Sequence, residues 1–113
     1  MDKNSGELIG EDGSGASAGA LHAAWSSLTF GNIKGEEILI WGGTDGFCYG
    51  YINQTQKDGD GYDLFQPKWK VDCNELSYRK DKEGRKIPYA TPPGPSELIG
   101  TPVLYEDKIY CAI

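Results

Sequence analysis

The sequence predicts an all-β fold made of short antiparallel strands. Glycine and proline are frequent, with 16 and 6 residues among 113, and aromatic residues make up 12%. Such a composition is typical of strands joined by tight turns, because aromatic side chains favour a pleated surface and glycine favours turns. Short apolar runs are also separated by turn signals, as in hairpins. A chain of this length suffices for one modest hydrophobic core.

The first 23 residues are expected to hold little regular structure. Asp2 to Gly6 has the composition of a turn, because Asn and Ser side chains bond to the local backbone. Glu7 to Ile9 is a candidate short strand. Gly10 to Gly19 is rich in Gly, Ser and Ala and lacks an apolar period, so we assign it no regular structure.

Residues 24–72 predict one complete meander of four strands. The first strand alternates, so that Leu28 and Phe30 share one face, and the second is an apolar run that suits burial on both faces. A polar, acidic excursion at residues 53–66 precedes the fourth strand. The four strands are expected at Trp25–Phe30, Ile38–Trp41, Phe47–Ile52 and Pro67–Asp72.

The stretch GGTDG, residues 42–46, predicts a hairpin corner between the second and third strands. A phosphate-binding loop needs a Lys followed by Ser or Thr and then a helix, and the sequence has neither at this place. We attribute Gly42, Gly43 and Gly46 to backbone positions that need positive φ.

The rest of the chain predicts a long loop and a second hairpin. Residues 73–97 are charged at first and then proline-rich, and proline cannot donate to a strand ladder. Residues 98–113 predict a strand, a tight turn at Glu106 and Asp107, and another strand. The hairpin pattern therefore returns after roughly seventy residues, and repeated meanders are typical of radially repeated sheets.

Four groups of residues follow one repeat pattern in order. They are the opening strands at Thr101 to Tyr105 with Ile109 and Tyr110, the corner and third strand at Asp45, Gly46, Tyr49 and Gly50, the closing Trp69, and the turn at Asp2, Ser5 and Gly6. This pattern resembles the PQQ-like β-propeller repeats, which quinoprotein dehydrogenases share with outer-membrane assembly propellers of the BamB type. Ile52 and Gly10 depart from it, where the family has Asp and Trp.

The resemblance implies a partial β-propeller of four-stranded antiparallel blades. Residues 1–23 correspond to the end of a preceding blade and a connector, 24–72 to a complete blade, 73–97 to a loop, and 98–113 to the first half of the next blade. A propeller closes with about 4 to 8 blades, so the resemblance implies a fragment of a longer protein. It also implies that Trp69 stacks on a turn of a neighbouring blade.

No catalytic, cofactor-binding or metal-binding residue is assigned from the sequence. The acidic stretch from Asp58 begins like a calcium loop, but Asp63 and Trp69 occupy the places of its required Gly and Glu. His22 is the single histidine. Trp25, Trp41 and Trp69 are assigned to packing rather than to stacking on a ligand.

The cysteines Cys48, Cys73 and Cys111 form neither a CxxC pair nor an even framework, so they leave the redox compartment open. A formal net charge of −6 disfavours nucleic acid and anionic lipid surfaces as partners. Apolar runs stay well below the ~20 residues that span a bilayer, so membrane insertion is not expected. No signal peptide is visible, although the resemblance suggests a periplasmic or extracellular location.

The sequence is therefore interpreted as a non-catalytic scaffold that binds a protein, a ligand or the remaining blades of its own propeller. Two alternatives stay open. One is a fragment of a quinoprotein dehydrogenase that uses PQQ and calcium, although the adjacent cysteines typical of those enzymes are missing. The other is a small β domain that binds carbohydrate through exposed tryptophans.

Overall fold

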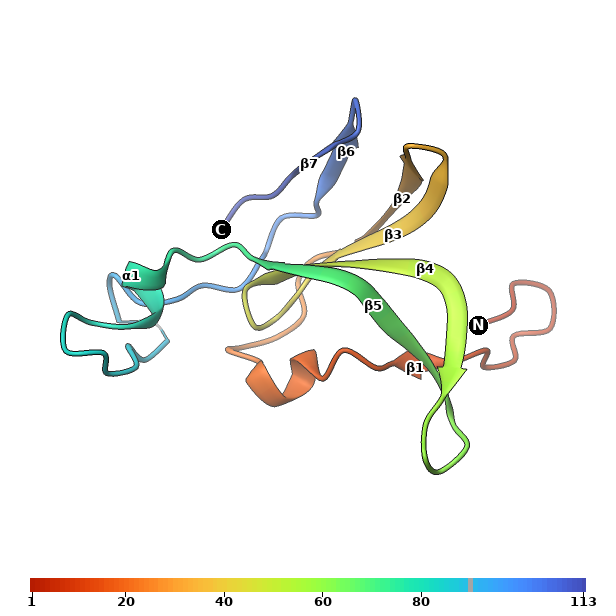
Figure 1. Cartoon of the computed structure of the whole chain (residues 1–113), viewed down its shortest axis with the longest axis horizontal. Coiled ribbons are helices and arrows are strands. Elements are labelled where there is room, and N and C mark those ends of the chain that lie inside the picture. Colours follow the sequence, from red (N-terminus) through yellow and green to blue (C-terminus); the bar gives the residue numbers. More distant parts are fainter. Residues whose placement is uncertain (90) are drawn as a thin grey trace.

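The computed structural model describes residues 1–89 and 91–113, and most of the regular secondary structure in these residues is β-strand (Figure 1). The prediction of an all-β protein is confirmed. The strands are β1 (Glu11–Asp12), β2 (Leu28–Ile33), β3 (Glu36–Gly42), β4 (Phe47–Lys57), β5 (Asp63–Asp72), β6 (Val103–Tyr105) and β7 (Lys108–Tyr110). A 3-10 helix at Ala16–Gly19 and a single helical turn, α1, at Leu76–Arg79 complete the described elements.

Strands β1 to β5 form one sheet in the order β1-β5-β4-β3-β2, and β6 and β7 form a separate hairpin. Strands β2 to β5 are a simple antiparallel meander, whereas β1 pairs with β5 in parallel. Lys34 and Gly35 join β2 to β3 with φ values of 52° and 88°. Positive φ at both central residues is the type I′ turn, whose twist matches that of the strands it connects.

All four strands of the meander differ in extent from the sequence prediction, and β3 extends over Glu36–Gly42 rather than Ile38–Trp41. Strand β2 begins at Leu28 rather than Trp25 and continues to Ile33. Strands β4 and β5 continue through most of the polar stretch 53–66, so that only residues 58–62 form the tip. Hydrogen bonds between strands need no apolar side chains. Hydrophobic alternation in the sequence therefore underestimates the length of two strands, such as β4 and β5, where their side chains are polar and in contact with solvent. Pro67 is accommodated where the β4–β5 register shifts next to Tyr51.

The N-terminal segment also differs from its prediction. Glu7 to Ile9 forms no strand, and the supposedly irregular connector instead contains β1 and the 3-10 helix. The reason is close contact with β5. A Cβ on Gly10 would lie 2.9 Å from the Asp63 carbonyl oxygen of β5, and one on Gly13 would lie 2.4 Å from the Gln66 side chain. Glycine at these positions lets the segment lie along the sheet edge.

The meander buries two small clusters, one on each face. On one face Ile38, Ile40 and Cys48 pack with Leu98, and the β6–β7 hairpin covers them through Leu104 and Ile109. We call this the hairpin-covered face. The radius of gyration is 15.6 Å, against about 13 Å for a compact domain of this length. The molecule is accordingly open, with little of its sheet surface enclosed.

The opposite face of the meander is named the groove face. Strand register places its members side by side, since Leu28 pairs with Trp41, Phe30 with Leu39, and Trp41 with Tyr49. The 3-10 helix covers part of this face by packing Ala16 against the buried Tyr49 and Tyr51. Towards β2 the face is uncovered, because Leu28 and Phe30 are 61% and 64% exposed.

Candidate functional site

The corner at residues 42–46 is confirmed as a hairpin connection, and all five residues are buried. Only Gly46 has positive φ, at 82°, so the attribution of Gly42 and Gly43 to positive φ is wrong. These two glycines are required by close packing instead. A Cβ on Gly42 would lie 2.8 Å from the Cβ of Leu98, and one on Gly43 would lie 2.6 Å from the Oδ1 of Asp45.

The backbone carbonyls of the corner bind segments that are distant in the sequence. The N–H of Leu21 donates to the Thr44 carbonyl at 2.8 Å, and Arg79 donates through Nη2 to the Asp45 carbonyl at 2.8 Å. Asn74 bridges the corner to the proline-rich loop, since its Nδ2 donates to the carbonyls of Gly46 and Ser96. The corner is thus a structural joint that fixes both long connections to the end of the meander.

Two buried tyrosines extend from this joint along β4. The hydroxyl of Tyr49 donates to Asp45 Oδ2 at 2.5 Å, and the hydroxyl of Tyr51 donates to Asp12 Oδ1 at 2.9 Å. Burial raises the pKa of both phenols, and the neighbouring carboxylates raise it further, although a hydrogen bond with Ser14 lowers that of Tyr51. Both phenols are therefore neutral hydrogen-bond donors near pH 7.

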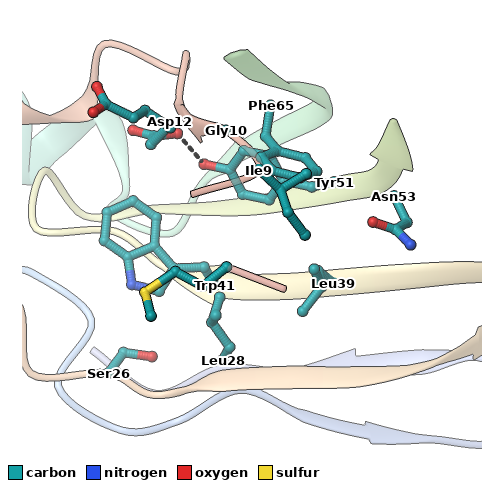
Figure 2. A pocket seen from close by; sticks show the side chains of 12 residues that line it. Ile9, Gly10, Asp12, Ser26, Leu28, Leu39, Trp41, Tyr51, Asn53 and Phe65 are labelled. Atoms are coloured by element: carbon teal, nitrogen blue, oxygen red, sulfur yellow. Dashed lines mark hydrogen bonds between the residues drawn. The ribbon is translucent and has the colours of Figure 1, made fainter. Parts of the chain in front are cut away.

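A groove of about 510 Å³ lies on the groove face, between the N-terminal segment and strands β2 and β3 (Figure 2). Figure 2 shows Trp41 and Leu39 at its floor, with Ile9 on one side and Leu28 on the other. The hydrogen-bonded pair of Asp12 and Tyr51 lies at one end. Concave, mostly apolar sites of this size with a few polar groups are the usual form of binding sites.

The β6–β7 hairpin repeats the β2–β3 hairpin in its backbone. Glu106 and Asp107 have φ values of 47° and 57°, so the turn has positive φ at both central residues, as at Lys34 and Gly35. The predicted tight turn is confirmed. Cross-strand residue pairs of the later hairpin match those of the earlier one at an offset of 72 residues (103 − 31 and 110 − 38). The pair Val103–Tyr110 corresponds to Gly31–Ile38, and the pair Tyr105–Lys108 corresponds to Ile33–Glu36.

These two hairpins lie face to face, as Figure 1 shows for β6 and β7 beside β2 and β3. The side chain of Leu104 fills the space above Gly31, where an added Cβ would lie 2.3 Å from its Cδ2. Three hydrogen bonds connect the hairpins: Ser27 N to Thr101 Oγ1 at 3.1 Å, Lys34 N to Asp107 Oδ1 at 3.3 Å, and Thr29 Oγ1 to the Pro102 carbonyl. The turn of the β6–β7 hairpin consequently lies next to the turn of the β2–β3 hairpin.

The side of the β6–β7 hairpin that points away from the sheet is named the open hairpin face. Val103, Tyr105 and Tyr110 lie on it and are 57%, 60% and 53% exposed. By the 72-residue offset they correspond to Gly31, Ile33 and Ile38, which lie on the hairpin-covered face of the meander. The open hairpin face of β6–β7 therefore corresponds to the hairpin-covered face of β2–β3, 72 residues earlier in the sequence.

Burial and tertiary structure bring the three cysteines together. Burial raises the pKa of Cys48, and a hydrogen bond with the Cys111 thiol raises it further. Burial also raises the pKa of Cys73 to about 11, and Cys111 again contributes. The sequence did not indicate this grouping, because its members are far apart along the chain. All three are free thiols, and the raised pKa values make Cys48 and Cys73 weak nucleophiles.

The remaining candidates lie apart from the groove. His22 lies in the N-terminal connection, and its ring stacks with those of Trp25 and Tyr89 at centroid distances of 5.9 and 6.1 Å. At the β4–β5 tip, the carboxylate of Asp58 accepts the N–H groups of Asp60 and Tyr62, both at 2.9 Å. Within residues 1–89 and 91–113, no group of three or more His, Cys, Asp or Glu side chains is placed to hold a metal ion.

The chain matches no protein-family model, no curated protein and no solved structure. Among the helices of the described residues, none combines the length and the apolar character needed to cross a bilayer.

The residues of this chain do not fit the PQQ site that the dehydrogenase alternative implies. That site in the resembled enzymes includes two adjacent cysteines, and the cysteines here are separated in the sequence. They approach one another only through tertiary packing, with Cys48 buried under the β6–β7 hairpin. We therefore derive no reaction step through this cofactor.

Proposed function

We propose that this chain is a non-catalytic scaffold and binding module, built of repeated β-sheets that stack face to face as the blades of a PQQ-like propeller do. The observation that supports it most directly is the stacking of two hairpins with the same turn and the same register, 72 residues apart. Matching sheets repeated at a fixed interval are typical of repeat proteins, in which each unit packs mainly on its neighbours.

The direction of stacking further supports the proposal. Leu104 and Ile109 of the later hairpin pack on the hairpin-covered face of the earlier one. By the 72-residue offset, they correspond to Asn32 and Glu37, which belong to the groove face. The face of the later hairpin that corresponds to the groove face thus packs on the hairpin-covered face of the earlier hairpin. This arrangement continues in one direction, as stacked blades require.

The chemistry of the hydrogen-bonded carboxylates, phenols and thiols favours a structural role for these groups over a catalytic one. The carboxylates of Asp45 and Asp12 each accept a hydrogen bond from a tyrosine. Burial raises the pKa of the Tyr49 and Tyr51 phenols and of the Cys48 and Cys73 thiols. Groups in these states stabilise structure, whereas a nucleophile or general base needs a pKa near the working pH.

A tandem protein tests the proposal. A second copy of residues 28–99 is placed directly before residue 28 of the chain, so that the join preserves the 72-residue offset. The unit that follows it carries Asn32→Leu and Glu37→Ile, because these positions take the places of Leu104 and Ile109 in the new contact. We expect the urea midpoint of unfolding to rise with one added unit and again with two, because each adds a neighbour contact. The matched control carries Gly31→Glu in the added unit, where any side chain meets the following hairpin. Added units that unfold separately at low urea would contradict the proposal.

A further inference from the structure

Two of the three thiols lie side by side at the end of β4 and β5. Cys48 of β4 pairs with Val71 of β5. The pairing continues past the end of β5, because the N–H of Cys73 donates to the Gly46 carbonyl at 3.1 Å. Cys73 lies two residues after Val71, so it is directed to the same face as Cys48. Cys48 belongs to the buried cluster of the hairpin-covered face, and Cys73 packs against that cluster.

The third thiol comes from the other side of this contact, at the end of the β6–β7 hairpin. Cys111 lies two residues after Ile109 of β7, and Ile109 packs on the cluster that contains Cys48. Because alternate residues of a strand share a face, Cys111 is also directed towards the meander. Figure 1 shows the C-terminal end beside the segment that follows β5, and a hydrogen bond joins the thiols of Cys111 and Cys73. These two cysteines are therefore neighbours across the contact between hairpin and meander.

We propose that Cys73 and Cys111 form a disulfide bond that fastens the β6–β7 hairpin to the end of β5. The oxidant is a small disulfide such as oxidised glutathione. The exposed Cys111 attacks it as a thiolate, forms a mixed disulfide and releases one glutathione. Cys73 then loses its proton and attacks the Cys111 sulfur, and the second glutathione leaves. Two protein thiols are oxidised, one small disulfide is reduced to two thiols, and the two protons pass from the cysteines to glutathione.

Burial assigns the second position in the bond to Cys73 rather than to Cys48. Cys48 is only 4% exposed and lies under the hairpin, whereas Cys73 is half-buried. Burial raises the pKa of both thiols, and more strongly that of Cys48, so Cys73 supplies more thiolate at a given pH. The inference uses only the packing of the hairpin on the meander, so it is independent of the repeat interpretation.

The bond acts on a hairpin that is weakly held. Strands β6 and β7 have three residues each and form a separate two-stranded sheet, which is marginally stable on its own. The three hydrogen bonds described above attach this hairpin through Thr101, Pro102 and Asp107, all of which precede β7. A disulfide at Cys111 adds an attachment after β7, so that both ends of the hairpin are fixed.

Oxidation of the whole chain tests the pairing. The reduced protein is treated with oxidised glutathione at about pH 8, where thiol exchange is fast, and linked peptides are mapped by mass spectrometry. We expect Cys73–Cys111 as the main product, with Cys48 still reduced. In denaturing urea the product should change to Cys48–Cys73, because an unfolded chain closes the shorter loop more readily. A folded protein that uses Cys48, or that keeps glutathione on Cys111, would overturn the proposal.

Two variants separate the roles of the thiols. Cys73→Ser removes the second thiol, so the mixed disulfide on Cys111 should accumulate at least about tenfold more than in the wild type, where the neighbouring thiol is at high effective concentration. Cys48→Ala is the matched control and should still form the Cys73–Cys111 bond. Equal accumulation of the mixed disulfide in Cys73→Ser and the wild type would contradict the assigned neighbour.

The stability of the oxidised wild type tests the fastening itself. Closing the loop between Cys73 and Cys111 should raise the urea midpoint by roughly 1 M or more. Hydrogen exchange of the amides in residues 103–110 should slow at least about tenfold, since local opening of the hairpin is restrained. Dithiothreitol should reverse both changes. Exchange in the hairpin that oxidation leaves unchanged would show that the bond does not hold it.

Discussion

The indole of Trp69 lies directly against the α-carbon of Gly50 on the neighbouring strand. A Cβ added to Gly50 would be 2.1 Å from Cε2 of the ring, far inside contact distance. The two residues are paired across β4 and β5, and Trp69 also packs on the buried cluster of the hairpin-covered face. The predicted closing tryptophan is thus placed within its own sheet, where glycine provides the space for it.

Gly50→Ala is expected to destabilise the fold. The new methyl group must displace the indole, and overpacking of this kind costs about 1–3 kcal/mol. Urea unfolding followed by circular dichroism measures the loss. Gly59→Ala is the control, because nothing lies within 4 Å of a Cβ there, and it should change the free energy of unfolding by less than about 0.5 kcal/mol. Equal stability of the two variants would contradict the assigned packing.

Tyr49→Phe should lower the free energy of unfolding by about 1.5–3 kcal/mol, because it leaves the buried Asp45 carboxylate without the phenol donor. Tyr62→Phe is the matched control, since the Tyr62 side chain is 67% exposed. Comparison of urea midpoints at pH 7 tests the difference. A Tyr49→Phe variant as stable as the control would show that the hydrogen bond to Asp45 contributes nothing net.

Stability should fall at alkaline pH, and Tyr49 should account for part of the fall. Its ordinary pKa is 10.0, and burial raises that value in the folded protein. The unfolded chain therefore releases the phenolic proton first, so the stabilisation is complete below about pH 10 and is lost as the pH rises further. Between pH 9 and 11.5, the urea midpoint of Tyr49→Phe should decline less steeply than that of the wild type. Parallel declines would contradict the shift.

The cysteines should react with iodoacetamide in the order of their exposure and thiolate content. Cys111 is exposed and should react first. Burial raises the pKa of Cys73 from 9.0 to about 11, so near pH 8 its thiolate fraction, and hence its rate, should be about a hundredfold below that of an ordinary thiol. Cys48 should react only on unfolding. Peptide mapping by mass spectrometry follows each site, and rapid labelling of Cys48 at neutral pH would contradict its burial.

The sequence by itself determined the strand character of the chain and most of its turns. The apolar run at Ile38–Trp41 and the aromatic run from Phe47 are local patterns, and the structure has β3 and β4 there. The turn at Glu106 and Asp107 was also readable, because it separates two short apolar runs. Local alternation suffices for such features, since a strand must direct alternate side chains to opposite faces.

Tertiary structure alone decided which distant surfaces meet. The parallel pairing of Glu11 and Asp12 with β5 and the grouping of three separated cysteines leave no local signal in the sequence. The role of Gly42 and Gly43 also depended on neighbours such as Leu98, not on their own backbone angles. Hydrophobic alternation in the sequence indicates that one face of a strand is apolar, but it does not indicate which segment covers that face. That depends on packing between distant segments, and here it leaves Leu28 and Phe30 uncovered while Ile38 and Ile40 are enclosed.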